Sequence, residues 1–376
     1  MTQPGAAAPP PAPAQPKPAG WHQVALIFKT MGIGAAGGAV FAWLGTPLPW
    51  MLGALFATMV ASMSGVNLYM HQMVRRIWII VLGLTLGSSF TPEVLDHIHL
   101  WVVSFLGMVA FVIFGTWLSY QIFVRIGRID RTTAFFCSSP GGLGEMIILG
   151  PLLGGDERTI VLTHATRVVM VMAIIPPAYS ILAGYVPPML IGSTTFFWEM
   201  PVRDLVIFGV TGLVGAGVAK LIKMPAWQMT GPMIASAAIH IGGISDTSPP
   251  SDFIAVAQVV MGAGAGARFS GVKLHELVRP AVVSGFATIC LLVTAAVAAV
   301  GLAAVTGLDF RAIHLAYSPG GFAEMSLIAL SLGIEVPFVS LHHLGRLVVV
   351  ITFASIVASI GQKRRSKALL ERDKAP

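Results

Sequence analysis

Two glutamates, placed identically behind two copies of a Ser-Pro-Gly-Gly motif, are the side chains of this sequence best placed to do chemistry. The first copy occupies positions 139–142 and is followed by Glu145. The second occupies 318–321 and is followed by Glu324, a constant spacing of 179 residues. Both copies lie in strongly apolar surroundings, where Pro-Gly-Gly breaks a helix and an ionised carboxylate is costly. A carboxylate kept in such a place is suited to carry a proton or to hold a cation.

The groups around each glutamate favour an anion. Glycine lets a ligand approach the backbone, and proline fixes a turn without needing a hydrogen-bonded N–H. The helix expected after each motif points its free N–H groups and the positive end of its dipole at the break, and serine hydroxyls add donors. The two motifs therefore supply these candidate substrate-binding residues: Ser138, Ser139, Pro140, Gly141, Gly142, Glu145, Ser318, Pro319, Gly320, Gly321 and Glu324. A structural alternative for the glutamates is a capping box at the start of that helix, and the two roles are compatible.

A His-x-x-Arg element follows each motif, again 179 residues apart, as His164 with Arg167 and His343 with Arg346. The arginines are candidates to pair with the glutamates or to bind a substrate carboxylate. Their alternative role is that of interfacial anchors whose head groups reach water. We interpret the histidines as helix-packing residues.

The two halves differ at three positions that bear on the site. Tyr317 replaces Ser138 and Ala323 replaces Gly144, which makes the two motifs chemically unequal. Gln258 stands where the first half has an apolar isoleucine. A polar side chain unique to one half, at membrane depth, is a further candidate for substrate binding.

Composition indicates that these residues are positioned by membrane helices. The chain is 55% hydrophobic and 10% charged, with a mean hydropathy of +0.81. Soluble domains carry about 25% charged residues. The net charge of +7 is the bias expected of cytoplasmic loops rather than a nucleic-acid-binding surface. The two cysteines predict neither a disulfide framework nor a metal site, and no cofactor is expected.

The duplication defines the domain organisation. Glycines recur at the same spacing, as Gly83 with Gly262 and Gly87 with Gly266. We predict a disordered cytoplasmic tail over 1–20, a first membrane repeat over 21–184, a linker over 185–201, a second repeat over 202–361 and a basic cytoplasmic tail over 362–376. Apolar spans are expected over about 24–44, 50–66, 77–90, 100–124, 159–182, 204–221, 227–244, 253–267, 281–305 and 338–360.

Charge predicts the topology. The loop with Glu93 and Asp96 is acidic, whereas its counterpart in the second half holds Arg268, Lys273 and Arg279, so the repeats are predicted to be inverted. Inversion requires an odd number of crossings in each half. Each limb flanking Pro-Gly-Gly is about ten residues long, roughly 15 Å of helix and half of a bilayer core. The predicted fold is therefore an all-α polytopic membrane protein, with about ten transmembrane helices, two re-entrant hairpins and both termini in the cytoplasm.

The twin Ser-Pro-Gly-Gly-x-x-Glu-Met elements, each followed by His-x-x-Arg, resemble the duplicated bacterial membrane family called AbrB, also named for an ammonia monooxygenase. The early Pro47-x-Pro49-Trp50 turn is similar to that family as well, and the resemblance covers about residues 24–360. It implies an inner-membrane protein related to cation–proton antiporters and anion carriers, with a link to regulation of gene expression. No basic soluble module for DNA binding is recognisable in the sequence, and the histidines lack the spacing of a metal-dependent oxygenase.

Secondary transport of a small polar or anionic solute, probably the wrong word for no other class of membrane pore, is not the only function compatible with these residues.

Overall fold

The computed structural model describes residues 20–92, 94, 98–182, 196–245, 247–272 and 274–372, and these form fourteen α-helices. Six of the helices are long and apolar enough to cross a membrane: α1 (Gly20–Trp43), α4 (Ile98–Gln121, continued by a π-helical turn to Ile126), α7 (Glu157–Leu182), α8 (Val202–Leu221), α11 (Leu274–Thr306) and α14 (Val336–Arg372). The others are α2 (Pro49–Met63), α3 (Gln72–Gly87), α5 (Arg131–Ser138), α6 (Leu143–Leu152), α9 (Trp227–Ile241), α10 (Ser251–Gly266), α12 (Phe310–Tyr317) and α13 (Phe322–Ser331).

The predicted spans each contain one of these helices, and local signals explain several of the boundaries. Asp130 accepts a hydrogen bond from the Thr133 N–H (2.9 Å) and so caps α5, and Asp309 caps α12 through the Arg311 N–H (2.8 Å). The breaks after α5 and α12 fall on the two Pro-Gly-Gly motifs. Three helix pairs, α3 with α10, α5 with α12 and α6 with α13, have bounds that differ by 179 residues at both ends.

Four of the predicted spans form helices of only 15 or 16 residues: α2, α3, α9 and α10. At 1.5 Å per residue they are about 23 Å long, less than the 30 Å core of a typical bilayer. The basic segment expected as a tail from 362 continues α14 as helix to Arg372. Residues 1–19, most of the 185–201 linker, Glu93, Asp96 and Lys273 lie outside the described residues.

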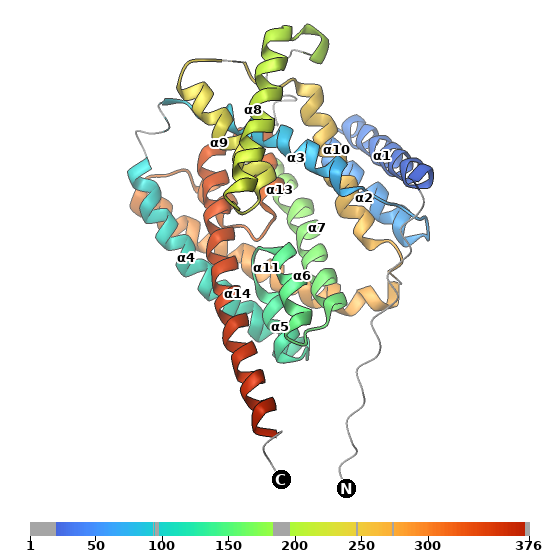
Figure 1. Cartoon of the computed structure of the whole chain (residues 1–376), viewed down its shortest axis with the longest axis vertical. Coiled ribbons are helices and arrows are strands. Elements are labelled where there is room, and N and C mark those ends of the chain that lie inside the picture. The colour runs from blue at the N-terminus through green and yellow to red at the C-terminus, as the bar shows by residue number, and fades with distance from the viewer. Residues whose placement is uncertain are drawn as a thin grey trace.

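The helices form two groups (Figure 1). The first helix group contains α1–α3 and α8–α10, and the second contains α4–α7 and α11–α14. Glycine brings backbones together in the first group: Gly83 of α3 lies against the Met229 carbonyl of α9, and Gly262 of α10 lies against the Met51 carbonyl of α2. A side chain at either glycine would overlap that backbone, so these crossings require glycine. The same contact is thus made twice with the two halves exchanged.

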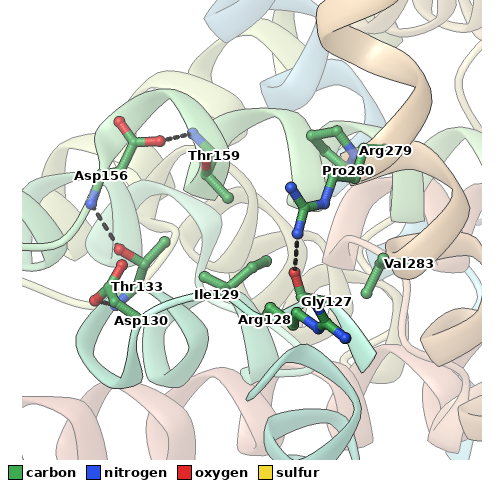
Figure 2. A pocket seen from close by; sticks show the side chains of 10 residues that line it. All are labelled: Gly127, Arg128, Ile129, Asp130, Thr133, Asp156, Thr159, Arg279, Pro280 and Val283. Carbon is green, nitrogen blue, oxygen red and sulfur yellow. Dashed lines mark hydrogen bonds between the residues drawn. The ribbon is translucent and has the colours of Figure 1, made fainter. Parts of the chain in front are cut away.

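The two broken segments enter the second helix group from opposite ends. The Asp156 N–H, just before α7, donates to the Thr133 hydroxyl in the first turn of α5 (2.8 Å), so the two ends of the α5–α6 segment lie together (Figure 2). At the other end of α7, the Tyr179 hydroxyl lies 2.7 Å from Nδ1 of His314 in α12. Since α7 spans 26 residues, or about 39 Å, the segments start far apart and their breaks point inward.

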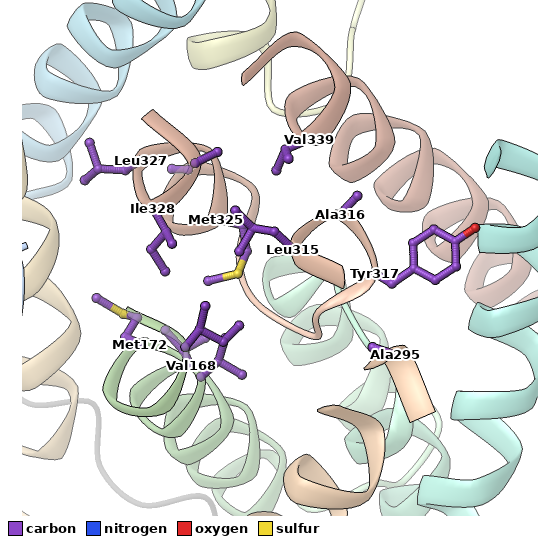
Figure 3. Close-up of a cluster of buried hydrophobic side chains, with 14 of the residues drawn as sticks. Val168, Met172, Ala295, Leu315, Ala316, Tyr317, Met325, Leu327, Ile328 and Val339 are labelled. Carbon is purple, nitrogen blue, oxygen red and sulfur yellow. The ribbon is translucent and has the colours of Figure 1, made fainter. Parts of the chain in front are cut away.

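The main hydrophobic core encloses the second broken segment (Figure 3). Tyr317 at the end of α12 is fully buried, and its hydroxyl donates to the Ser104 carbonyl of α4 (2.5 Å). Met325 and Ile328 of α13 pack in the same core as Val168 and Met172 of α7. This packing holds a non-helical turn rigidly at the centre of the second helix group.

Candidate functional site

Two tips, the non-helical turns 139–142 and 318–321, form the centre of the candidate site, and their backbones differ. Gly142 caps α6 in the left-handed region at φ 68°, where glycine is favoured. Gly321 caps α13 in extended conformation at φ −76° and ψ 154°. The duplicated sequence therefore adopts two different turns, in keeping with the unequal residues beside each motif.

The His-x-x-Arg elements fasten both tips by the same hydrogen bonds. Arg167 donates to the Ser139 carbonyl, and Arg346 donates to the carbonyls of Ser318 and Gly320 (2.5 Å each). These arginines are 5% and 2% exposed. They satisfy carbonyls that the ends of α5 and α12 leave without helical partners, which does not fit the role of interfacial anchors.

The histidines assist one turn earlier. Nε2 of His164 lies 2.8 Å from the Phe136 carbonyl, and Nε2 of His343 lies 3.1 Å from the Leu315 carbonyl. Both rings are buried between helices, as expected of helix-packing residues. Each element thus holds the end of the short helix that leads into its tip.

A cavity of about 650 Å³, here called the tip cavity, lies between the two helix groups. It is lined by both tips, by the residues that follow them and by Arg167, His343 and Arg346 of the second helix group. The first helix group contributes Arg75 and Ile79 of α3, the segment 223–229 at the start of α9, and Arg268 after α10. Arg346 connects the tips, because its Nε lies 3.5 Å from the position a Cβ would take on Gly141.

The tip cavity carries an excess of positive charge. Arg75, Arg167, Lys223, Arg268 and Arg346 line it together with two carboxylates. Burial strengthens the field of these charges. A small anion is the ligand that such a cavity attracts.

The two glutamates occupy different positions in this field. Glu324 is 7% exposed and lies 3.7 Å from the Arg75 guanidinium, which belongs to the other helix group. Glu145 is half-buried and leans over the first tip, with Oε2 3.6 Å from the position a Cβ would take on Gly142. Neither carboxylate closes a capping box with the described backbone.

The structure brings eight of the predicted site residues to the tip cavity and leaves six away from its lining. Those on the lining are Gly141, Gly142, Glu145, Arg167, Gly320, Gly321, Glu324 and Arg346. Those not on it are Ser138, Ser139, Pro140, Gln258, Ser318 and Pro319.

The serine hydroxyls serve the backbone instead of the cavity. Ser138 donates to the Phe135 carbonyl (2.8 Å), Ser139 to the Gly141 carbonyl (2.9 Å) and Ser318 to the His314 carbonyl (2.7 Å). Gln258 is buried in α10, and its Oε1 has no hydrogen-bond partner in the described part of the chain.

Sequence reasoning missed three basic residues of the cavity, Arg75, Lys223 and Arg268. It used Arg75 and Arg268 only as markers of cytoplasmic loops. Their position at the ends of short helices was the available signal, because a short helix places its terminal side chains near membrane depth. Within the described residues, no three His, Cys, Asp or Glu side chains gather closely enough to hold a metal ion.

Comparison with known proteins places the chain in a family. The family model described as "Transition state regulatory protein AbrB" matches residues 50–361. The chain is 27% identical over 342 residues to "Uncharacterized protein YhjN" of Bacillus subtilis (strain 168), covering 85% of this chain and 89% of that protein. It is 24% identical over 316 residues to "Putative regulator AbrB" of Escherichia coli (strain K12), covering 82% and 87%. With the family model matched over most of its length, the chain belongs to the AbrB family.

Proposed function

We propose that this protein is a secondary transporter of the bacterial inner membrane, which moves a small anionic solute coupled to H⁺ or Na⁺. The observation that carries this proposal is the tip cavity, where two backbone turns and five basic side chains converge between two helix groups. Transport sites of inverted-repeat carriers lie at broken helices near the bilayer midplane. The partners proposed are the solute, the coupling ion and the lipid bilayer, with a homodimer as an open alternative and no nucleic acid.

We further infer ten crossings, inverted repeats and cytoplasmic termini. The exchanged glycine contacts of the first helix group and the opposed entry of the broken segments support inversion. With the basic ends of α3, α8 and α10 in the cytoplasm, Arg75, Lys223 and Arg268 lie on the cytoplasmic side of the tip cavity. The cavity then faces the cytoplasm.

An elevator-like movement follows from where the tips are attached. Both tips and both fastening arginines belong to the second helix group, whereas glycine contacts bind the first group together. Movement of the second group against the first would carry the tips and a bound solute as one unit. The Arg75–Glu324 ion pair crosses this boundary and would break or re-form during the movement.

Glu145 is the proposed coupling carboxylate. It lies beside the first tip and lines the cavity, and no ion pair engages it among the described residues. It can therefore change protonation state, or bind a cation, without first losing an arginine partner. Glu324, which already pairs with Arg75, is second in line.

Flux of small anions into proteoliposomes tests the proposal. A thermal-stability screen of the purified protein against carboxylates, phosphate and sulfate selects the anions to use, since a ligand of the folded state raises the melting temperature. We expect uptake of a stabilising anion to depend on an imposed proton or sodium gradient. Stabilisation without flux under any gradient would contradict transport.

A membrane sensor is the second candidate. The observation that favours it is the name of the Escherichia coli relative, which describes that protein as a regulator. A sensor would bind an effector in the tip cavity without moving it across the membrane. Binding with no flux, together with altered gene expression when Arg346 is replaced, would support the sensor over the transporter.

A further inference from the structure

A second, much smaller cavity lies behind the first tip, on the far side of Arg167 from the tip cavity. This rear cavity measures about 10 Å³ and is lined by Ser119 of α4, Cys137 of α5, Thr163 and Arg167 of α7, and Ser284 and Thr288 of α11, with four apolar neighbours. The volume corresponds to about one water molecule.

Three buried polar atoms of the rear-cavity residues have no hydrogen-bond partner among the described residues: the hydroxyls of Ser119 and Thr163 and Nε of Arg167. Ser119 and Thr163 are each 1% exposed, and Arg167 is 5% exposed. Buried polar groups in native proteins nearly always have a partner, either protein or ordered water. Three such atoms around one small cavity therefore indicate a shared ligand.

The chemistry of the lining identifies that ligand. Nε of Arg167 can only donate, whereas the two hydroxyls can donate or accept. A cation would face a buried guanidinium with no carboxylate in the lining, which is electrostatically unfavourable. A water molecule accepts from Nε and exchanges hydrogen bonds with both hydroxyls, within the two to four polar partners that buried waters have.

The duplication supplies an internal comparison. At the spacing of 179, Ser119 corresponds to Ala298, Cys137 to Ala316, Thr163 to His342 and Ser284 to Phe105. The rings of Phe105 and His342 pack against each other there, with centroids 6.1 Å apart. The second half thus fills with rings and methyl groups the place that the first half lines with hydroxyls.

We propose that the rear cavity binds one structural water molecule, held by Ser119, Thr163 and Arg167, with no counterpart in the second half. The water holds Nε of Arg167 from behind while a terminal nitrogen of the same guanidinium holds the Ser139 carbonyl. Arg346 instead uses both terminal nitrogens on its tip. The proposal does not depend on transport.

Radiolytic labelling of the full chain in nanodiscs, in water enriched in oxygen-18, tests for this water. Hydroxyl radicals generated from a bound water oxidise the thiol next to it, and mass spectrometry reads the label. With Cys290 replaced by alanine, we expect label at Cys137 although that side chain is only 1% exposed. The matched control is Ala316→Cys in a chain without Cys137, which places a thiol at the equivalent buried position of the second half.

The expected result is labelling of Cys137 several-fold faster than of the control thiol, and loss of that difference in Ser119→Val, which fills the cavity. Ala298→Val, the same change at the equivalent position, should leave Cys137 labelling unaltered. If Ala316→Cys fails to fold, the Ser119→Val comparison still decides. Slow labelling of Cys137 in the parent chain, or unchanged labelling in Ser119→Val, would overturn the proposal.

Discussion

Replacing Arg346 by methionine tests whether the arginines fasten the tips. Methionine keeps much of the side-chain length and removes both donors to the carbonyls of Ser318 and Gly320. A buried acceptor left without a partner costs about 1–3 kcal/mol, so two cost about 2–6 kcal/mol of stability. At about 2 °C per kcal/mol for a large chain, the melting temperature should fall by roughly 4–12 °C.

The assay is thermal unfolding of the purified protein in detergent, read by tryptophan fluorescence. Arg346→Lys should fall between the parent and the methionine variant, because an ammonium keeps the charge but not the planar pair of donors. Arg125→Met is the matched control, since Arg125 is exposed at the end of α4. If Arg346→Met melts within about 1 °C of that control, the carbonyls do not depend on Arg346 and the reasoning fails.

The remaining predictions concern topology, backbone and coupling. In a chain lacking Cys137 and Cys290, single cysteines introduced by Asp130→Cys or Arg158→Cys should react with impermeant reagents from the cytoplasm, and those introduced by Arg311→Cys or Glu335→Cys from outside. Reaction of either pair from opposite faces would end the re-entrant arrangement. Gly142→Ala should destabilise the protein by about 1–2 kcal/mol in thermal melts, because a left-handed conformation strains any other L-residue. An unchanged melting temperature would count against the turn described here. Glu145→Gln should abolish the response of anion flux to a proton or sodium gradient, and full gradient-driven flux in that variant would move the coupling role to Glu324.

Much of the fold could be predicted because the duplication is written at a single spacing. The breaks at the two Pro-Gly-Gly motifs and the recurrence of His-x-x-Arg follow from residue type alone, and the observed helices match them. The direction of a serine hydroxyl does not follow from residue type. The structure turns Ser138 and Ser318 toward nearby carbonyls, because a short helix end has carbonyls to satisfy.

The first helix group's share of the cavity was harder to foresee. Arg75 and Arg268 reach the tips only because two separate helix groups meet there, and no local pattern encodes that meeting. Gln258 illustrates the converse. It was selected because it is polar where the first half has Ile79, yet Ile79 lines the tip cavity and Gln258 does not.

The different backbones of the two tips have a consequence for how each position can change in evolution. At position 142 every replacement meets the same left-handed backbone, so no change elsewhere in the side chains relieves it. At position 321 the backbone accepts any residue, and the obstacle is the carboxylate of Glu324, which a Cβ would overlap. A replacement there becomes tolerable once residue 324 shortens or turns away, as in Gly321→Ala combined with Glu324→Asp. The first tip is therefore closed to stepwise drift, whereas the second is open to paired substitutions that would alter its charge and its glycine together.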